Sequence, residues 1–371
     1  MIDRREFIAA AGAAALVAPL ASAAGGFRPE AYQRAIVVDA LGGPGSYDSE
    51  PAAGWSAAEI GDVRASGVTA VNLTVNPPGN SPGRFEATVA GIARVDREVE
   101  RHPDVFLRVL TAADLALAKT TRRLGLIYGF QDTTMLEGDL GRLDVFEGLG
   151  VRIVQPTYNR ANVMGDGCLE SRDAGLTRLG HELIEALAKR RLLLDLSHAG
   201  ARTIDEAIAA STGPLAITHT GCRALSDLPR NVRDESLKAL ADKGGVAGIY
   251  FMCFLRTAGQ PHSEDLIRHL EHAVNVCGED HVGLGTDGSI SALKVDDAFR
   301  AAFRAEISAR IAAGISAPGE SPDVLNMIPE YNSPQRFQLL ADDLARRGWT
   351  AGRIEKILGR NFARLFTAVW G

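Results

Sequence analysis

The sequence has few cysteines and no concentrated basic charge, and each absence excludes a class of protein. Its four cysteines, Cys168, Cys222, Cys253 and Cys277, are scattered along 371 residues. No two of them have the CxxC spacing of zinc or redox sites, and four are too few for a disulfide scaffold. The net charge is -6, and no cluster of Lys and Arg marks a nucleic-acid-binding surface. We therefore expect neither thiol chemistry nor a nucleic-acid partner.

Charged residues are also in the minority, at 23% against 46% apolar residues. This balance excludes disordered, fibrous and multi-spanning membrane proteins. The length is about two to three times that of an average domain, but (β/α) barrels often reach it as one domain. A single large core is therefore expected.

The N-terminal segment has the pattern of a bacterial export signal. Arg4 and Arg5 precede an Ala-rich, uncharged run that ends in a small-x-small cleavage pattern at Ala23. A twin-arginine pair in this position predicts export by the twin-arginine route. We therefore expect residues 1–24 to be removed, residues 25–371 to form one domain, and the mature protein to be periplasmic, where disulfides are permitted.

Eight short apolar runs alternate with amphipathic stretches after this signal. Such runs are typical of parallel strands that are buried on both faces. Eight of them, alternating with helices, predict an α/β fold and specifically a (β/α)8 TIM barrel. The expected strands lie at 35–39, 68–75, 124–131, 151–155, 192–197, 214–219, 245–251 and 281–287, and an insertion at 300–332 follows the last.

Two of the intervening stretches, 176–190 and 203–210, show a clear helical pattern. Thr203, followed three residues later by Glu206, has the spacing of a capping box. The second helix is therefore expected to begin at Thr203.

Polar residues end most of the expected strands, where a barrel carries its active site. His198 and His219 end successive strands, and imidazoles on neighbouring strands about 5 Å apart can share one metal ion. Asp287 ends the strand that closes the barrel, where it would be a third ligand, a base for water, or only a helix N-cap. The strand-end set is Asp39, Asn76, Gln131, Tyr158, His198, His219 and Asp287.

Four side chains near these strand ends are candidates for binding substrate or stabilising charge. Arg230 lies in a loop stiffened by a proline, and its guanidinium can bind a carboxylate bidentately. Tyr158 can donate to an oxygen on which negative charge develops. Gln131 and Asn159 are candidate substrate-binding amides. The alternatives to these roles are that Arg230 is an ordinary solvent-exposed residue and that Tyr158 is a buried residue of the core.

Several motifs follow one another in a fixed order. They include Leu194-Asp-Leu-Ser-His198, Ile217-Thr-His219, Arg230-Asn-Val-Arg-Asp-Glu235, Val282-Gly-Leu-Gly-Thr-Asp287 and Leu358-Gly-Arg-Asn-Phe362. Together they resemble the renal, or membrane, dipeptidase family of metallopeptidases, peptidase family M19. The resemblance runs from about residue 35 to 366 and implies a metal-dependent-hydrolase barrel, a dipeptide-like substrate and a homodimer.

The resemblance also implies roles for individual residues. His198 and His219 match ligands of the family's second zinc ion. Arg230 matches the residue that binds the substrate carboxylate, and Asp287 matches an Asp near the substrate amine.

The sequence departs from the family where the first zinc ion is bound. The family has Asp-Gly-His-x-Asp, but this chain has Asp39-Ala-Leu-Gly-Gly, and Leu41 and Gly43 cannot bind a metal. Gln131 stands where the family has a bridging Glu, and a neutral amide cannot supply an anionic bridge between two cations. Ligands that serve the same metal are therefore lost together.

Tyr158 stands where the family has a His that polarises the scissile carbonyl. With the first zinc site lost, a binuclear zinc centre is not expected. The expected cofactor is one Zn2+ or none, and its remaining ligands would be His198, His219 and Asp287.

Three functions are consistent with this set of residues. The first is an exported dipeptidase-like hydrolase that cleaves a dipeptide or another small carboxylate-bearing amide with at most one metal. The second is a metal-independent lyase, isomerase or metabolite-tailoring enzyme in which Asp287 or a His moves protons and Tyr158 is the acid. The third is a non-catalytic binding protein that retains Arg230. No membrane anchor is expected, because the sequence ends without a hydrophobic tail.

Overall fold

The computed structural model describes residues 26–45, 54–76, 83–314 and 316–371. The expected export signal lies outside these residues. No helix in the described part of the chain is long and apolar enough to span a membrane.

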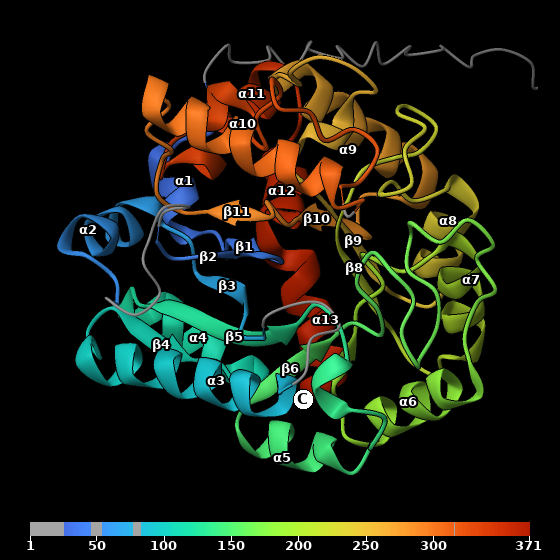
Figure 1. The fold of residues 1–371 in the computed structure, drawn as a ribbon. Coiled ribbons are helices and arrows are strands. Elements are labelled where there is room, and N and C mark those ends of the chain that lie inside the picture. Colours follow the sequence, from blue (N-terminus) through green and yellow to red (C-terminus); the bar gives the residue numbers. More distant parts are fainter. Residues whose placement is uncertain (1–25, 46–53, 77–82, 315) are drawn as a thin grey trace, which may run out of the picture.

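Eight parallel strands form a barrel surrounded by helices, which confirms the predicted (β/α)8 fold (Figure 1). One sheet has the order β1-β3-β5-β6-β7 and a second has the order β10-β9-β8. Each of the eight expected runs overlaps one of these strands. The strands are β1 (Val38–Asp39), β3 (Ala70–Thr74), β5 (Leu124–Phe130), β6 (Val151–Val154), β7 (Leu193–Leu194), β8 (Ala216–Thr220), β9 (Val246–Ile249) and β10 (Val282–Leu284).

Two seams join these sheets into a closed barrel. At the first seam, the Ala40 amide donates to the Leu284 carbonyl at 2.9 Å, which links β1 to β10. At the second, the Leu196 amide donates to the Ala216 carbonyl at 3.0 Å, which links β7 to β8. Strands one and eight of the prediction are therefore neighbours.

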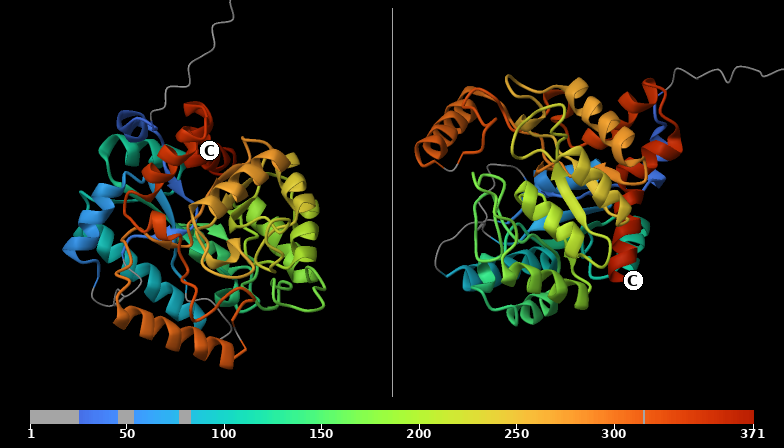
Figure 2. Two further views of the ribbon diagram at one scale, coloured as in Figure 1. Left: turned by 90° about the horizontal axis from the view of Figure 1, so that it is seen from above. Right: turned by 90° about the vertical axis from the view of Figure 1, so that its right-hand side faces the viewer.

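The helices surround the barrel, except for α13, which closes one end of it (Figures 1 and 2). Phe362, Leu365 and Phe366 of α13 pack against the buried side chains that the strands direct into the barrel. The helices are α1 (Pro29–Arg34), α2 (Ala57–Ser66), α3 (Arg84–Arg101), α4 (Ala112–Thr121), α5 (Arg142–Gly148), α6 (Arg178–Lys189), α7 (Ala201–Ala210), α8 (Asp234–Asp242), α9 (Ser263–Cys277), α10 (Asp297–Ala312), α11 (Arg336–Arg346), α12 (Ala351–Glu355) and α13 (Asn361–Trp370).

The insertion after β10 lies at the opposite end of the barrel from α13. It begins with β11 (Gly288–Ser289), which pairs in parallel with β2 (Gly42–Gly43) beyond the ends of β1 and β10. The insertion then forms α10, and Figure 2 shows α10 and α13 at opposite ends of the molecule. The mouth of the barrel is therefore the end that α10 overhangs.

Two local features differ from the sequence-based expectations. Strand β4 (Phe106–Arg108) was not expected and pairs with the first residues of β5. The predicted capping box is wrong, because α7 begins at Ala201. Instead, the Thr203 hydroxyl donates to the Asp166 carbonyl at 2.9 Å, and Glu206 accepts from the Leu176 amide at 2.8 Å. Contacts with residues distant in the sequence therefore occupy the Thr203 and Glu206 side chains, which were expected to cap the helix.

The cysteines form no disulfide in the structure. Cys222 and Cys253 are buried, and Cys168 and Cys277 are half-buried, all as free thiols. Burial raises the pKa of the Cys168 thiol. These side chains therefore pack as small apolar groups.

Close packing of β8 and β9 gives a first prediction. A Cβ atom on Gly248 would lie 2.0 Å from the Thr218 carbonyl oxygen, which belongs to the neighbouring strand. Gly248→Ala should therefore lower the free energy of unfolding by about 2 kcal/mol or more, measured by denaturant titration. Gly61→Ala is the matched control, because no atom lies within 4 Å of its Cβ position. The control should gain up to about 1 kcal/mol of helix stability, and equal effects would contradict this account.

The Asp39 carboxyl group at the β1–β10 seam gives a second prediction. It accepts from the Thr286 amide at 2.7 Å and the Thr286 hydroxyl at 2.6 Å. Burial nevertheless raises its pKa from 3.8 to about 7. Between these values the folded state binds the proton more tightly than the unfolded state, so the group's contribution to stability falls as pH rises from 4 to 7.

Asp39→Asn should remove this contribution, at roughly 1.4 kcal/mol for each unit of pKa difference. The measurement is urea unfolding of both proteins at several pH values from 4 to 8. Parallel curves for the two proteins would show that the Asp39 pKa is not raised.

Candidate active site

Two buried imidazoles meet at the mouth of the barrel. His219 lies in β8, and His198 lies four residues after the end of β7. Their Nε2 atoms are 3.0 Å apart. The prediction that these residues form a pair is therefore consistent with the structure.

A buried carboxylate, Asp195, fixes the two strand ends that carry these imidazoles. It accepts from the Ser197 hydroxyl at 2.6 Å, and from the amide and the hydroxyl of Thr218 at 2.9 and 2.5 Å. The Gln155 amide nitrogen donates to it at 2.7 Å. Sequence reasoning missed Asp195, although it lies three residues before His198. Burial raises the pKa of this carboxyl group, whereas the four donors lower it.

Three side chains surround the His198 ring. Asn159 Oδ1 lies 2.6 Å from Nδ1, and Gln131 Oε1 lies 3.0 Å from Nε2. The Tyr158 ring stacks on the imidazole with centroids 4.1 Å apart. The structure therefore brings together side chains from the ends of four strands, β5, β6, β7 and β8: Gln131, Tyr158, Asn159, His198 and His219.

These contacts determine which ring nitrogens carry protons. Asn159 Oδ1 can only accept, so His198 Nδ1 donates to it and Nε2 keeps a lone pair. Thr218 Oγ1 donates to Asp195, so it accepts from His219 Nδ1 at 2.8 Å, and His219 Nε2 also keeps a lone pair. Together with Gln131 Oε1, three lone-pair atoms then converge. Such an arrangement suits a metal cation or a hydrogen-bond donor, and an Arg230 Nη atom lies 3.4 Å from His198 Nε2.

Proton uptake by this pair is disfavoured. Burial is the main cause that lowers the pKa of His198, followed by the positive charge of Arg230 and by His219. Burial and Arg230 also lower the pKa of His219. Both imidazoles are therefore neutral at physiological pH, which is the form that binds metals.

Arg230 lies beside the imidazoles and is 3% exposed. One of its Nη atoms donates to the Ser197 carbonyl, and the other lies 3.4 Å from His198 Nε2. Its guanidinium also faces Tyr250 and Phe254 at about 6 Å. The expected carboxylate-binding Arg is therefore buried inside the site and is not solvent-exposed.

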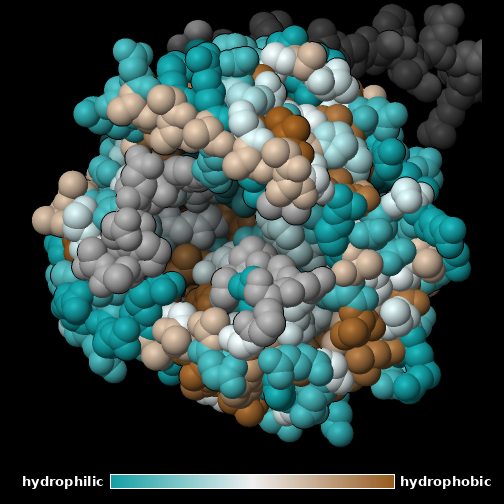
Figure 3. Space-filling model, in the orientation of Figure 1, coloured by the Kyte–Doolittle hydropathy of each residue, from teal (hydrophilic) through white to brown (hydrophobic). Residues whose placement is uncertain are grey.

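Asp287 and Tyr158 line one cavity of ≈ 250 Å³ under the insertion. Figure 3 shows that this face of the molecule is hollowed near its centre. Asp287 has a φ of +54°, a conformation that costs energy in a non-glycine residue and is common at functional sites. Burial raises the Asp287 pKa, and burial also raises the pKa of Tyr158 to about 12. Tyr158 therefore remains a hydrogen-bond donor at neutral pH.

The donor set fits one zinc ion better than it fits two. Ligand nitrogens about 2.0–2.1 Å from tetrahedral zinc are about 3.4 Å apart, close to the observed separation of the imidazoles. No group of three His, Cys, Asp or Glu side chains that could hold a metal occurs among the described residues. Asp287 therefore forms no metal-binding group with His198 and His219 in the structure, whereas Gln131 Oε1 lies 3.0 Å from His198 Nε2.

The insertion supplies side chains that sequence reasoning did not identify. Arg310, Glu320 and Arg336 line the same cavity as Asp287 and Tyr158. No motif marks them, because their positions depend on how the insertion folds over the mouth. They are considered further below.

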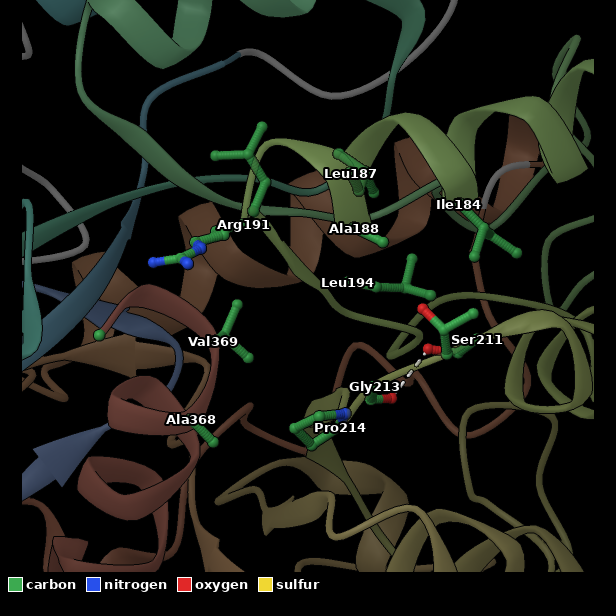
Figure 4. A pocket seen from close by; sticks show the side chains of 13 residues that line it. Ile184, Leu187, Ala188, Arg191, Leu194, Ser211, Gly213, Pro214, Ala368 and Val369 are labelled. Carbon is green, nitrogen blue, oxygen red and sulfur yellow. Dashed lines mark hydrogen bonds between the residues drawn. The ribbon is translucent and has the colours of Figure 1, made fainter.

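A larger cavity of ≈ 410 Å³ lies near the opposite end of the barrel. Figure 4 shows it between Leu187 and Ala188 of α6 and Val369 of α13, beside the hydrogen bond from Ser211 to Gly213. It is near the starts of β7 and β8, whereas catalysis in barrels takes place at the strand ends. This cavity is therefore not the candidate active site.

Comparisons with known proteins identify relatives of this chain. The chain is 33% identical over 189 residues to an uncharacterized protein in the pqqA 5′ region of Klebsiella pneumoniae, with 48% of this chain and 70% of that protein covered. It is 26% identical over 290 residues to dipeptidase verJ of Clonostachys rogersoniana, with 77% and 66% covered.

Among solved structures, an amidohydrolase from Pseudomonas aeruginosa superposes with a TM-score of 0.78 at 30% identity, covering 92% of this chain and 98% of that one. The sequence model of membrane dipeptidases matches residues 49–298. The chain therefore belongs to the membrane dipeptidase family, peptidase family M19.

Proposed function

We propose that this protein hydrolyses the amide bond of a small, dipeptide-like molecule that carries a free carboxylate, and that it uses one zinc ion. The main support is the convergence of three lone-pair atoms, His198 Nε2, His219 Nε2 and Gln131 Oε1, with 3.0 Å from the first to each of the others. Family membership supports the reaction class.

The two imidazoles and the Gln131 carbonyl would hold the zinc ion. When bound, zinc would polarise the scissile carbonyl and lower the pKa of a water molecule. Asn159 and the Asp195–Thr218 pair orient the imidazoles from behind, as outer partners of metal ligands commonly do.

The other residues bind and orient the substrate. Tyr158 can donate its hydroxyl proton in a hydrogen bond to a developing oxyanion, because its raised pKa keeps it protonated. Arg230 is the cation beside the imidazoles, and it can bind a carboxylate through N–H groups that the protein leaves unused. Asp287 is the anion at the mouth, and it can bind a substrate ammonium group or accept a proton.

One observation favours a second candidate, a metal-free enzyme on the same scaffold. The Arg230 guanidinium lies 3.4 Å from His198 Nε2, so a cation already borders the imidazole pair. In this alternative, Arg230 donates to His198, while Tyr158 and Asp287 move protons. Metal content distinguishes the two candidates.

Export through the twin-arginine route to the periplasm is also part of the proposal. It is supported by the Arg4-Arg5 pair and the Ala-rich run that follows. Cofactor insertion before export would suit this route, because it carries folded proteins.

The proposal predicts about one zinc per chain by elemental mass spectrometry of the purified protein. His219→Ala should lose the zinc and at least about a hundredfold of the dipeptide hydrolysis rate, because one imidazole ligand is removed. His181→Ala, an exposed helical position, is the matched control and should retain both. Full hydrolysis without zinc would support the metal-free alternative instead.

Restoring the negative charge at Gln131 gives a further prediction. Gln131→Glu should tighten zinc binding by about tenfold or more, since outer-shell changes alone alter affinity by this much. Gln131→Met, which removes the oxygen donor at similar volume, should weaken it. The measurement is competition with a zinc chelator, and equal affinities in all three proteins would show that residue 131 is not a ligand.

A further inference from the structure

The cavity under the insertion contains a buried cation that forms no direct ion pair with a described residue. Arg336, the first residue of α11, is 8% exposed. Its Nε donates to the Ser333 carbonyl and one Nη donates to the Ile290 carbonyl, each at 3.0 Å. Among the described residues, no carboxylate forms an ion pair with it. Neutral carbonyl groups orient this guanidinium, and the buried Asp39 carboxyl group acts on its charge without a hydrogen bond or ion pair between them.

The other Nη atom of Arg336 remains available to a ligand. It makes no hydrogen bond with a described residue, and it lies 3.7 Å from the position of a Cβ on Gly288. The absent side chain at Gly288 keeps the approach to this nitrogen open. Asp39 is the carboxyl group that interacts electrostatically with Arg336, and Thr286 already occupies both its oxygens.

Arg310 in the same cavity is different, because its charge is compensated. Its Nε and Nη2 atoms each lie 3.0 Å from an oxygen of Glu320, in a bidentate pair. This pair contributes shape and hydrogen bonding but no net charge. Of these two guanidinium groups, Arg336 is therefore the one left to bind an anion.

Two unsatisfied polar atoms accompany Arg336 in the cavity wall. Ser291 Oγ is buried without a hydrogen-bond partner, and Ser291 is 5% exposed. Asn326 Oδ1 is likewise buried without a partner. Buried polar groups without partners are rare in folded proteins, and a ligand is one explanation. A hydroxyl beside a guanidinium is suited to a carboxylate.

Asp287 gives the same cavity a site for a positive group. A ligand that places an ammonium group on Asp287 and a carboxylate on Arg336 would complement both charges. An amino-terminal Asp or Glu residue carries these two groups a few bonds apart. Tyr158, which lines this cavity and stacks on His198, connects the cavity to the imidazole pair.

We propose that Arg336 and Ser291 bind the side-chain carboxylate of an acidic amino-terminal residue, so that the preferred substrates are dipeptide-like molecules that begin with Glu or Asp. The inference that the bound molecule is a substrate rests on the proposed amide hydrolysis. The carboxylate site itself does not depend on it.

The test compares Glu-Ala with Gln-Ala, which differ only in the side-chain charge. Binding is measured by calorimetry on the zinc-loaded protein, using analogues in which CH2–NH replaces the scissile amide so that they are not cleaved. Hydrolysis of the two natural dipeptides is measured separately as kcat/KM. The analogue of Glu-Ala should bind roughly tenfold to a hundredfold more tightly than that of Gln-Ala, because its contacts are charge-assisted.

Arg336→Gln should bring this ratio close to one, and Arg336→Lys should restore part of it. Ser291→Ala should reduce the ratio about threefold without loss of stability, since its hydroxyl has no partner to lose. Arg346→Gln, at the exposed end of the same helix, is the matched control and should leave the ratio unchanged.

The outcomes separate the two proposals. A binding ratio near one in the unmodified protein, or one that neither Arg336→Lys nor Ser291→Ala alters, overturns the carboxylate site. An Arg336-dependent binding ratio without hydrolysis of either dipeptide overturns the proposed hydrolysis but supports the site. Equal kcat/KM values together with equal binding support hydrolysis and overturn the site.

Discussion

The buried Asp195 carboxylate holds together the part of the barrel on which the site depends. Strands β7 and β8 share little backbone pairing, and Asp195 spans the seam by accepting from Ser197 and Thr218. These two residues immediately precede His198 and His219. One buried group therefore fixes both the seam and the imidazoles, so the fold and the site share a structural element. Both oxygens of Asp195 have donors, although Gln155, one of these donors, has a buried amide oxygen without a partner.

The structure also depends on the difference between the two ends of the barrel, of which one is closed and the other is open. Aromatic side chains of α13 fill one end of the barrel, while short strands β2 and β11 extend the wall at the other. Because the apolar packing is at the far end, polar side chains at the mouth do not disrupt it. This division explains how the chain can accommodate buried His, Arg and Asp groups close together without losing its core.

Backbone and neutral groups stand at the positions that match the family's first zinc site in the sequence resemblance. Gly43 lies in a β-bridge with Ser289, so the segment that would carry metal ligands has become part of the wall. Gln131 retains an oxygen in the site but without a negative charge. Arg230 instead adds a positive charge to the site, because its guanidinium lies close to His198. The His198–His219 pair is therefore bordered by a guanidinium and by neutral amides.

The sequence by itself determined the eight strands, their alternation with helices, and the polar residues at their ends. These follow from local periodicity and from the rule that strand ends converge in a barrel, so His198, His219, Gln131 and Tyr158 could be grouped in advance. It did not determine the start of α7, because the Glu206 carboxylate pairs with Arg202 and the Leu176 amide.

Only the tertiary structure decided which charged side chains form a direct ion pair. Arg310 and Arg336 have the same side chain and line the same cavity, yet one is paired with Glu320 and the other is held by neutral carbonyls. This difference arises from contacts between residues up to about fifty positions apart, which no local pattern encodes. Charge compensation depends on distance in space, and that is why the functional surface of the insertion could not be predicted from the sequence.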